Sequence, residues 1–163
     1  MIQMNIDIIP IKISNSKSKI KFEMDAGILI SKVIDGRFPD YTKVIPQNND
    51  KTLEIKLNEF KNSIERVTTV SSDRKEGLKM LISRDNLQLT VNNPNSGEGV
   101  ENINAKFNSN DLNICFNSRY LSDIASQIEN ESVVINLKDP GSPVLIRDFL
   151  DKNSFHVVMP MKI

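Results

Sequence analysis

Apolar and polar residues alternate along much of the chain. Ile20, Phe22 and Met24, for example, alternate with Lys21 and Glu23. A period of two places apolar side chains on one face of a strand and polar side chains on the other, so it predicts half-buried strands. The pattern predicts strands over residues 6–14, 19–25, 28–34, 53–57, 78–83, 87–92, 103–107, 112–116, 133–137 and 155–161.

The last of these strands is expected to have two faces of different character. Phe155, Val157, Met159 and Met161 should lie on its apolar face. His156 alternates with them and is expected on the opposite face.

Two other segments carry apolar residues at helical spacing. The first follows Asn58 and the second follows Asn117 or Ser118, and Asn is a favoured residue for capping the N-terminus of a helix. A recurrence every three to four residues gives each helix one apolar face for packing. The apolar positions are Phe60, Ile64 and Val67 in the first segment and Leu121, Ile124, Ala125 and Ile128 in the second.

The two predicted helices mark an internal repeat. Asn58 and Asn117 are 59 residues apart, and each follows a predicted strand and precedes a helix and further strands. Two units of strand, helix and three strands, with both helices packed on one antiparallel sheet, give an α+β fold. The first 40 residues or so contain only predicted strands, so they resemble the tail of a preceding unit with unpaired edges.

Composition narrows the class of protein. The 163 residues include 21 basic and 21 acidic side chains, which argues against a tight grip on nucleic acid but not against loose sliding contact. No apolar run approaches the roughly 20 residues of a membrane helix, and the first residues lack the features of a signal peptide. The single cysteine, Cys115, cannot form an internal disulfide, which indicates a reducing compartment. We expect a cytoplasmic protein with no membrane partner.

Residues suited to catalysis or cofactor binding are sparse. His156 is the only histidine, and on a strand it is more simply explained as a solvated position than as a general base. Cys115, between Ile114 and Phe116, fits a small buried side chain. The sequence contains neither a familiar zinc-ligand spacing nor a glycine-rich phosphate loop. We therefore expect no catalytic residue, no metal and no cofactor, and a small hydrolase is the least supported alternative.

Two apolar stretches lie where solvated residues are usual. Residues 37–46 combine aromatic, proline and aliphatic side chains in a predicted linker, and residues 157–163 are apolar almost throughout. A chain end is normally polar, so an apolar one is either buried or part of a binding surface. The two methionines around Pro160 make a soft surface that suits several different peptides.

Several strings in and near these stretches carry a family resemblance. They are Ile34-Asp35-Gly36-Arg37-Phe38-Pro39-Asp40-Tyr41, Phe116-Asn117 with Tyr120, Ser142-Pro143-Val144 and Val158-Met159-Pro160-Met161. In this order, over essentially the whole chain, they resemble the bacterial DNA polymerase III beta subunit, the sliding clamp.

The resemblance implies the DNA-clamp (processivity) fold. In this family two chains, each of three similar domains, close into a ring around duplex DNA, with helices lining the hole and sheets outside. Residues 1–42 match the last strands of the middle domain and a linker, and residues 43–163 match the C-terminal domain. Against the family pattern, the chain lacks the first domain and most of the second.

The resemblance also implies a function without catalysis. Family members tether polymerase to duplex DNA of any sequence. The expected partners are the DNA polymerase III catalytic subunit, the clamp loader, other polymerases and repair proteins with clamp-binding motifs, and, in the full-length family, a second copy in a ring homodimer. The alternative is a free-standing module that binds clamp-binding motifs without encircling DNA.

In the family, a hydrophobic cleft between the middle and last domains binds these short linear motifs. The matching positions are Pro39, Val44, Asn117, Tyr120, Pro143, Val157, Val158, Met159, Pro160 and Met161. Val157 and Met159 are alternatively core residues of their strand. Because the rest of the cleft belongs to the missing middle-domain segment, we expect weaker binding than in a complete clamp.

Two further surfaces are implied by the resemblance. The positions facing DNA are Lys43, Lys61, Arg66 and Arg119, which would contact phosphates without reading bases, or are alternatively ordinary solvated charges. The positions facing the other chain of the ring are Val70, Ser71, Glu98 and Glu101. With no first domain, the usual partner face is missing, which argues against ring closure by this chain alone.

Overall fold

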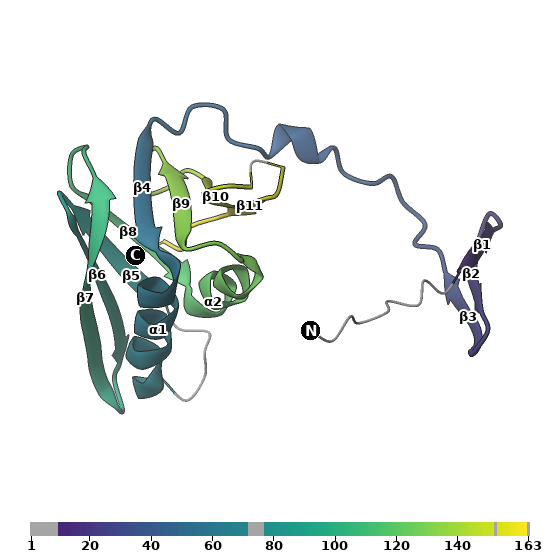
Figure 1. The fold of residues 1–163 in the computed structure, drawn as a ribbon, viewed down its shortest axis with the longest axis horizontal. Coiled ribbons are helices and arrows are strands. Elements are labelled where there is room, and N and C mark those ends of the chain that lie inside the picture. Colours follow the sequence, from purple (N-terminus) through teal and green to yellow (C-terminus); the bar gives the residue numbers. More distant parts are fainter. Residues whose placement is uncertain (1–9, 72–76, 152, 163) are drawn as a thin grey trace, which may run out of the picture. The chain divides into compact units, whose positions relative to one another are not determined.

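The first part of the chain is a small antiparallel sheet. The computed structural model describes residues 10–71, 77–151 and 153–162, and the chain divides into two compact units, Met1–Pro39 and Asp40–Ile163. In the first unit, β1 (Lys12–Asn15), β2 (Lys19–Met24) and β3 (Gly27–Lys32) pair antiparallel in that order (Figure 1). The strand predicted over residues 6–14 thus begins at Lys12, and its positions 6–9 lie outside the described residues.

This first sheet leaves most of its apolar side chains exposed. Ile28, Leu29 and Ile30 follow one another along β3, and each is more than half exposed. Because consecutive strand residues point to opposite faces, both faces of β3 carry exposed apolar surface. No residue of the described part of this unit is fully buried, as expected for strands without a covering helix.

The second unit repeats one order of elements twice, as the 59-residue repeat predicts. The first half-unit contains β4 (Lys51–Lys56), α1 (Leu57–Val67), β5 (Gly77–Ser83), β6 (Asn86–Asn93) and β7 (Gly97–Phe107). The second half-unit contains β8 (Leu112–Asn117), α2 (Ser118–Gln127), β9 (Ser132–Leu137), β10 (Val144–Asp148) and β11 (Phe155–Val158). Two short 3-10 helices, η1 (Tyr41–Lys43) and η2 (Thr68–Val70), precede β4 and follow α1.

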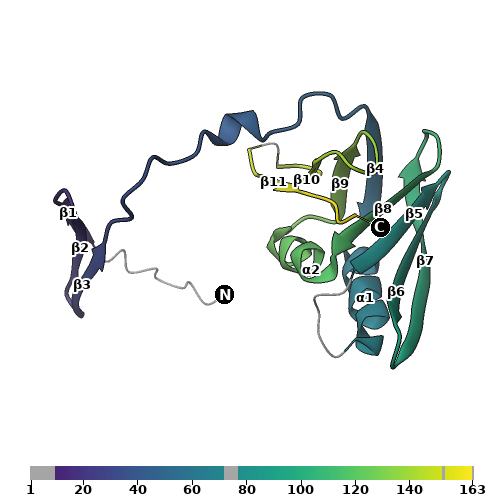
Figure 2. The ribbon, with the colours of Figure 1, turned by 180° about the vertical axis from the view of Figure 1, so that it is seen from behind.

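The strands of both half-units form one curled sheet. Within the described residues, eight antiparallel strands lie in the order β11-β10-β9-β4-β7-β6-β5-β8. Strand β4 joins the two halves, because it pairs with β7 of its own half-unit and with β9 of the other. The two ends of the sheet are linked where the backbone N–H of Met161 donates to the carbonyl oxygen of Cys115 in β8, at 2.7 Å. The sheet therefore bends back on itself (Figures 1 and 2).

The core lies between this sheet and the two α-helices. Helices α1 and α2 pack against each other, and Figure 2 shows them side by side. Their predicted apolar faces are buried, including Phe60 and Ile64 on α1 and Leu121 and Ala125 on α2. Full burial of a side chain such as Phe or Leu contributes about 1.5–3 kcal/mol, so this shared core holds the half-units together.

The predicted cap of the first helix is wrong. Helix α1 begins at Leu57, its N-cap residue is Lys56, and the Lys56 side chain makes no capping hydrogen bond. The Leu57 N–H instead donates to the carbonyl oxygen of Glu131 at 2.8 Å, so the helix starts directly from β4 and Asn58 lies inside it. The cap of the second helix is confirmed, because Asn117 accepts from the Arg119 backbone N–H at 3.0 Å.

The predicted faces of the last strand are also wrong. Val158 is the buried residue of β11 and lies opposite Val144, and His156 lies opposite Ile146, which is also in the core. Val157 therefore faces outward, while His156 shares the inward face. Alternation alone could not choose the inward face, because Phe155 and Val157 are as apolar as Val158.

Candidate functional site

The start of α2 presents an aromatic side chain to solvent. Strand β8 ends at Asn117, whose side chain fixes the first turn of α2 by accepting from the Arg119 backbone N–H. In the first turn of the helix, Tyr120 is 57% exposed, while Leu121 next to it is buried in the core. The rigid cap thus holds Tyr120 at the surface, beside the end of β8.

The residues after β11 are held against this same place. The Met161 N–H bonds to Cys115, two residues before Asn117, so the chain passes along the outer edge of β8. A Cβ atom added to Gly77, which lies opposite Asn117 in β5, would be 2.7 Å from the Cys115 Sγ atom and 4.0 Å from the Met161 Sδ atom. Gly77 therefore makes room for the two sulfur-bearing side chains.

Two methionines of this segment are accessible. The side chains of Met159 and Met161 are 61% and 39% exposed, and Pro160 between them is half-buried. The alternative in which Met159 is a core residue is thus wrong. We call the surface made by Asn117, Tyr120, Met159, Pro160 and Met161 the apolar wall.

The remaining predicted cleft positions of this unit lie on or next to β10 and β11. Val157 is half-buried and faces outward, but Val158 is only 6% exposed and belongs to the core. Pro143 directly precedes Val144, the partner of Val158, so it lies at the same end of the β10–β11 ladder as Met159. Its carbonyl oxygen accepts from the Asn49 Nδ2 atom at 3.0 Å, which ties the turn before β10 to the segment before β4.

The two predicted linker positions are Pro39 and Val44. Pro39 is the last residue of the first unit, and its place in a cleft stays a prediction. Val44 follows η1 and is exposed. The η1 turn is ordered by Asp40, whose carboxylate accepts from the Thr42 backbone N–H at 3.2 Å and from its hydroxyl at 2.6 Å.

The predicted DNA-facing cations have acidic neighbours. Lys43 lies 3.9 Å from Asp40, and the Arg119 Nε atom lies 3.9 Å from Asp123 one turn later on α2. These pairs are exposed, so each adds little to stability, and another anion can readily replace the carboxylate beside each cation. Between α1 and α2, a groove of about 250 Å³ is lined by residues that include Glu65 and Arg119. The helix surface is therefore of mixed charge.

Arg66, another predicted DNA-facing residue, is bound within the protein. Its Nε and Nη2 atoms donate to the two carboxylate oxygens of Glu101 at 2.8 and 3.0 Å, and Nη2 also donates to the Ser63 hydroxyl at 2.9 Å. The hydrogen bond from Arg66 lowers the pKa of Glu101. A phosphate group would have to compete with this two-pronged pair. Lys61, on the same helix, is half-buried.

The predicted interface positions gather where the end of α1 meets β7. A Cβ atom on Gly99 would lie 2.7 Å from the Val67 carbonyl oxygen, so this glycine allows the close contact. The contact brings Val70 and Ser71, at the end of η2, near Glu98 and Glu101, which flank Gly99 on β7.

Part of β7 has an open edge. Residues 105–107 of β7 pair with β4, whereas residues 97–104 pair with β6 on one side and, among the described residues, with no strand on the other. Unpaired backbone groups along such an edge are able to pair with another chain.

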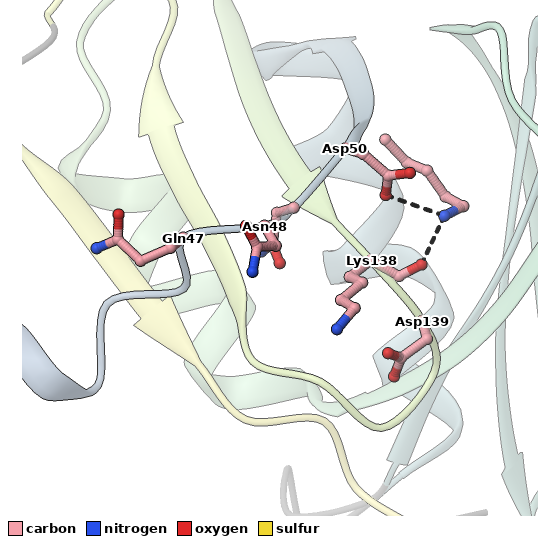
Figure 3. Close-up of a pocket in the computed structure, with 7 residues that line it drawn as sticks. Gln47, Asn48, Asp50, Lys138 and Asp139 are labelled. Carbon is pink, nitrogen blue, oxygen red and sulfur yellow. Dashed lines mark hydrogen bonds and ion pairs between the residues drawn. The ribbon is translucent and has the colours of Figure 1, made fainter.

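A polar depression at the start of β4 has no catalytic arrangement among the residues that line it. The Lys51 Nζ atom donates to Asp50 at 3.1 Å and to the Lys138 carbonyl oxygen at 2.7 Å (Figure 3). Asp139 accepts from Ser142 and Gly141, and these hydrogen bonds lower its pKa. The charged groups of the depression are therefore engaged in hydrogen bonds that stabilise the neighbouring turns.

Comparison with known proteins identifies the family. The family model of the DNA polymerase III beta subunit, C-terminal domain, matches residues 42–162. The chain belongs to this sliding clamp family.

The sliding clamp relatives are longer than this chain. It is similar to the beta sliding clamp of Caulobacter vibrioides (35% identity over 148 residues, 91% of this chain and 40% of the relative). It is also similar to that of Escherichia coli K12 (32% over 154 residues, 94% and 42%). A crystal structure of a Bartonella birtlesii sliding clamp bound to griselimycin superposes with a TM-score of 0.87 and 40% identity, covering 94% of this chain and 41% of that one. The chain thus spans about two-fifths of the length of these relatives.

The match confirms the predicted family and α+β clamp fold. Sliding clamps are non-catalytic accessory subunits, which agrees with the expectation that the chain is not an enzyme. In the described residues, no group of three or more His, Cys, Asp or Glu side chains is arranged to hold a metal ion. Burial raises the pKa of the Cys115 thiol, which disfavours a nucleophilic thiolate. Neither α-helix of the described part, at 11 and 10 residues, has the length and apolar character to span a bilayer.

Sequence reasoning missed one surface of this clamp domain. The outer face of β10 and β11 carries Leu145, Arg147 and Phe155, which line a depression of about 330 Å³ beside Val157. Residues 144–148 do not alternate, because Val144, Leu145 and Ile146 are all apolar and Arg147 and Asp148 are both charged, so periodicity gave no signal for β10 or for its outward side chains.

Proposed function

We propose that the chain is the C-terminal part of a bacterial DNA sliding clamp, which tethers DNA polymerase III and other replication and repair proteins to duplex DNA through a hydrophobic peptide-binding cleft. The observation that carries the proposal is the accessible apolar wall at the end of β11, within a domain of clamp fold. Tethering raises the effective concentration of polymerase at its template, which promotes synthesis without catalysis. Replicating DNA places this function in the bacterial cytoplasm.

The apolar wall suits short peptides with Leu or Phe anchors. The exposed parts of Tyr120, Met159 and Met161 offer apolar surface, and the unbranched methionines adapt to different side chains. Asn117 and the Tyr120 hydroxyl add groups for directional hydrogen bonds. Pro143 and Val157 continue the surface, Val158 supports it from the core, and Pro39 and Val44 would complete it from the linker. The clamp loader and other polymerases would use the same surface.

In a whole clamp, two other surfaces would serve the ring. The open edge of β7, together with Val70, Ser71, Glu98 and Glu101, is suited to pair with another chain, because strand addition satisfies free backbone groups. Lys61 and Arg119 on the helices, and Lys43 in η1, would contact DNA phosphates. Weak, evenly balanced charge fits a protein that slides, since tight phosphate contacts would hold it in place.

Peptide titration tests the cleft. A fluorescent peptide with Leu and Phe anchors is titrated with the chain, with Met161→Ala and with Met24→Ala, and the anisotropy gives each Kd. Met24 in β2 is a matched control, because it is 38% exposed against 39% for Met161. We expect Met161→Ala to weaken binding about tenfold, as at a contact that carries binding energy, and Met24→Ala to leave it unchanged. Equal losses for the two variants, or none, would contradict the cleft.

The alternative is a free-standing module that binds clamp-binding motifs without encircling DNA. It is favoured by the mixed charge of the helix surface. Gel filtration with circular and with linearised duplex DNA separates the two functions. Retention on circular DNA that is lost on linearisation supports a ring, and a monomer with no retention on either supports the module.

A further inference from the structure

The outer face of β10 carries a cation without a partner. Arg147 is partly buried, and its Nε atom is fully buried with no hydrogen-bond partner among the described residues. A buried donor without an acceptor is costly, and more so in a charged group. An anion that bound beside Arg147 would remove this cost, so the guanidinium favours a negatively charged ligand.

The surroundings of Arg147 are those of a small binding site. Arg147 lies opposite Phe155 in the β10–β11 ladder, so the guanidinium and the ring leave the same face of the sheet. Both line the depression of about 330 Å³, together with Leu145 and Gln47, and no acidic side chain lines it. On the same face of the sheet, Glu54 in β4 is already bound to Lys106 at 2.7 Å.

This depression lies next to Val157, one of the positions of the proposed peptide cleft. Leu145, which lines it, lies opposite Val157, and Arg147 lies opposite Phe155, two residues along the same strand. Two strand residues span about 7 Å, which is also the step of two residues in an extended peptide. A peptide with an apolar anchor near Val157 therefore reaches Arg147 with a side chain two or three residues away.

We propose that the depression receives a carboxylate side chain of the peptide that occupies the cleft, bound by Arg147 and covered by Phe155. The inference rests on the proposed function and names the residue class that flanks the anchors. A DNA phosphate is a poorer occupant, because Ile146, the neighbour of Arg147, faces the core beneath α1 and α2, so Arg147 points away from those helices.

The test compares acidic and neutral forms of one peptide. Two anchor peptides are made. One carries Glu two or three residues before the anchors and the other carries Glu two or three residues after them, and each has a counterpart with Gln in place of Glu. Anisotropy titrations use the 163-residue chain, Arg147→Gln, and Arg84→Gln as a matched control that removes an exposed arginine at the β5–β6 turn. Thermal unfolding of each variant checks that it is folded.

The proposal expects one Glu peptide to bind the chain about tenfold more tightly than its Gln counterpart. Arg147→Gln should abolish this gain and leave the affinity of the Gln peptide unchanged, whereas Arg84→Gln should preserve the gain. The gain should shrink in high salt. Equal binding of Glu and Gln peptides, or a gain that survives in Arg147→Gln, overturns the carboxylate site alone.

Two other outcomes are distinct. If neither peptide binds the chain, the proposed function fails and the carboxylate site fails with it. If duplex DNA competes with the Glu peptide and binds Arg147→Gln more weakly than the parent chain, the depression is a phosphate site. The proposal is then overturned.

Discussion

The two half-units of the clamp domain share one order of elements but differ in what they leave exposed. In the first, the strands β5, β6 and β7 have 7, 8 and 11 residues, and a backbone contact through Gly99 locks the end of α1 onto β7. In the second, β9, β10 and β11 have 6, 5 and 4 residues. The second half-unit also carries Tyr120, Phe155, Met159 and Met161 at the surface.

Under the proposed function, this difference separates stability from peptide binding within one repeated plan. Long strands and a close helix contact give the first half-unit a firm frame. In the second half-unit the strands are short, and apolar side chains point outward, where they are accessible to a partner. The repeat therefore reuses one fold for two tasks.

The largest effect should come from filling the contact at Gly99. In Gly99→Ala, the new methyl group would lie 2.7 Å from the Val67 carbonyl oxygen, a backbone atom, so α1 must shift away from β7. We expect a loss of about 3 kcal/mol in the free energy of unfolding, measured by urea titration. Gly141→Ala in the second half-unit is the control, because the nearest atom would be the Asp139 Oδ1 atom at 3.7 Å. Similar losses at both glycines would break the comparison.

Acid should act on the second half-unit. Burial raises the pKa of Asp148, but hydrogen bonds from Asn130, from the backbone of Leu150 and from the backbone of Asp151 outweigh it and lower the pKa to about 2. A carboxyl group with a lowered pKa contributes its full stabilisation at a pH above its pKa in the unfolded chain, which is near 3.9. This contribution is lost as the pH falls from about 4 towards 2.

The variant Asp148→Asn should therefore lose about 2 kcal/mol at pH 7, because the amide cannot serve as a charged acceptor. Its free energy of unfolding should also fall less between pH 5 and pH 2 than that of the parent chain. Urea titrations across this range measure both effects, with the exposed Asp111→Asn as control. A parallel fall in Asp148→Asn and parent would contradict the role of this carboxylate.

The two helix starts offer a smaller, paired test. Asn117→Ala removes the hydrogen bond to the Arg119 N–H and should cost about 1 kcal/mol. Asn58→Ala should change stability by less than about 0.5 kcal/mol, because Asn58 lies inside α1 and Ala favours a helix. Thermal unfolding of both variants measures the contrast, and equal losses would show that Asn58 is a cap after all.

The smallest effect is expected at the ion pair between α1 and β7. Arg66 and Glu101 are exposed enough for water and salt to screen them, so Glu101→Gln should destabilise the chain less than Asn117→Ala does. The loss should diminish in 1 M salt, and Glu98→Gln on the same strand should have no effect. A loss that is independent of salt would mean that the pair acts through packing instead.

Local patterns predicted most of the fold. The strand and helix periods located the elements of both half-units except β10, and the 59-residue repeat predicted their order, because each half-unit buries one apolar face in the same way. The pattern gave wrong predictions where a tertiary contact overrode a local sequence preference. Asn58 is not a cap because Glu131, far along the chain, already accepts from Leu57. Strand β11 was assigned the wrong inward face because both of its faces carry apolar residues.

The candidate site was less predictable than the fold. The apolar end of the chain indicated a binding surface, and the family resemblance supplied the individual cleft positions. Neither could indicate that Arg66 binds Glu101, or that Arg147 lies beside Phe155, because both depend on which strands are neighbours. Strand pairing in this domain joins distant parts of the sequence, and that information is absent from local periods.

The position of β4 has a consequence for how the domain forms during synthesis. Its partner β9 follows the whole first half-unit in the sequence. As the chain emerges from the ribosome, one edge of β4 therefore stays unpaired until β9 has been synthesised. Apolar strands with a free edge readily associate with the wrong chain. We therefore expect nascent chains that stop before residue 132 to need chaperones, and chains that extend beyond β9 to become much less dependent on them.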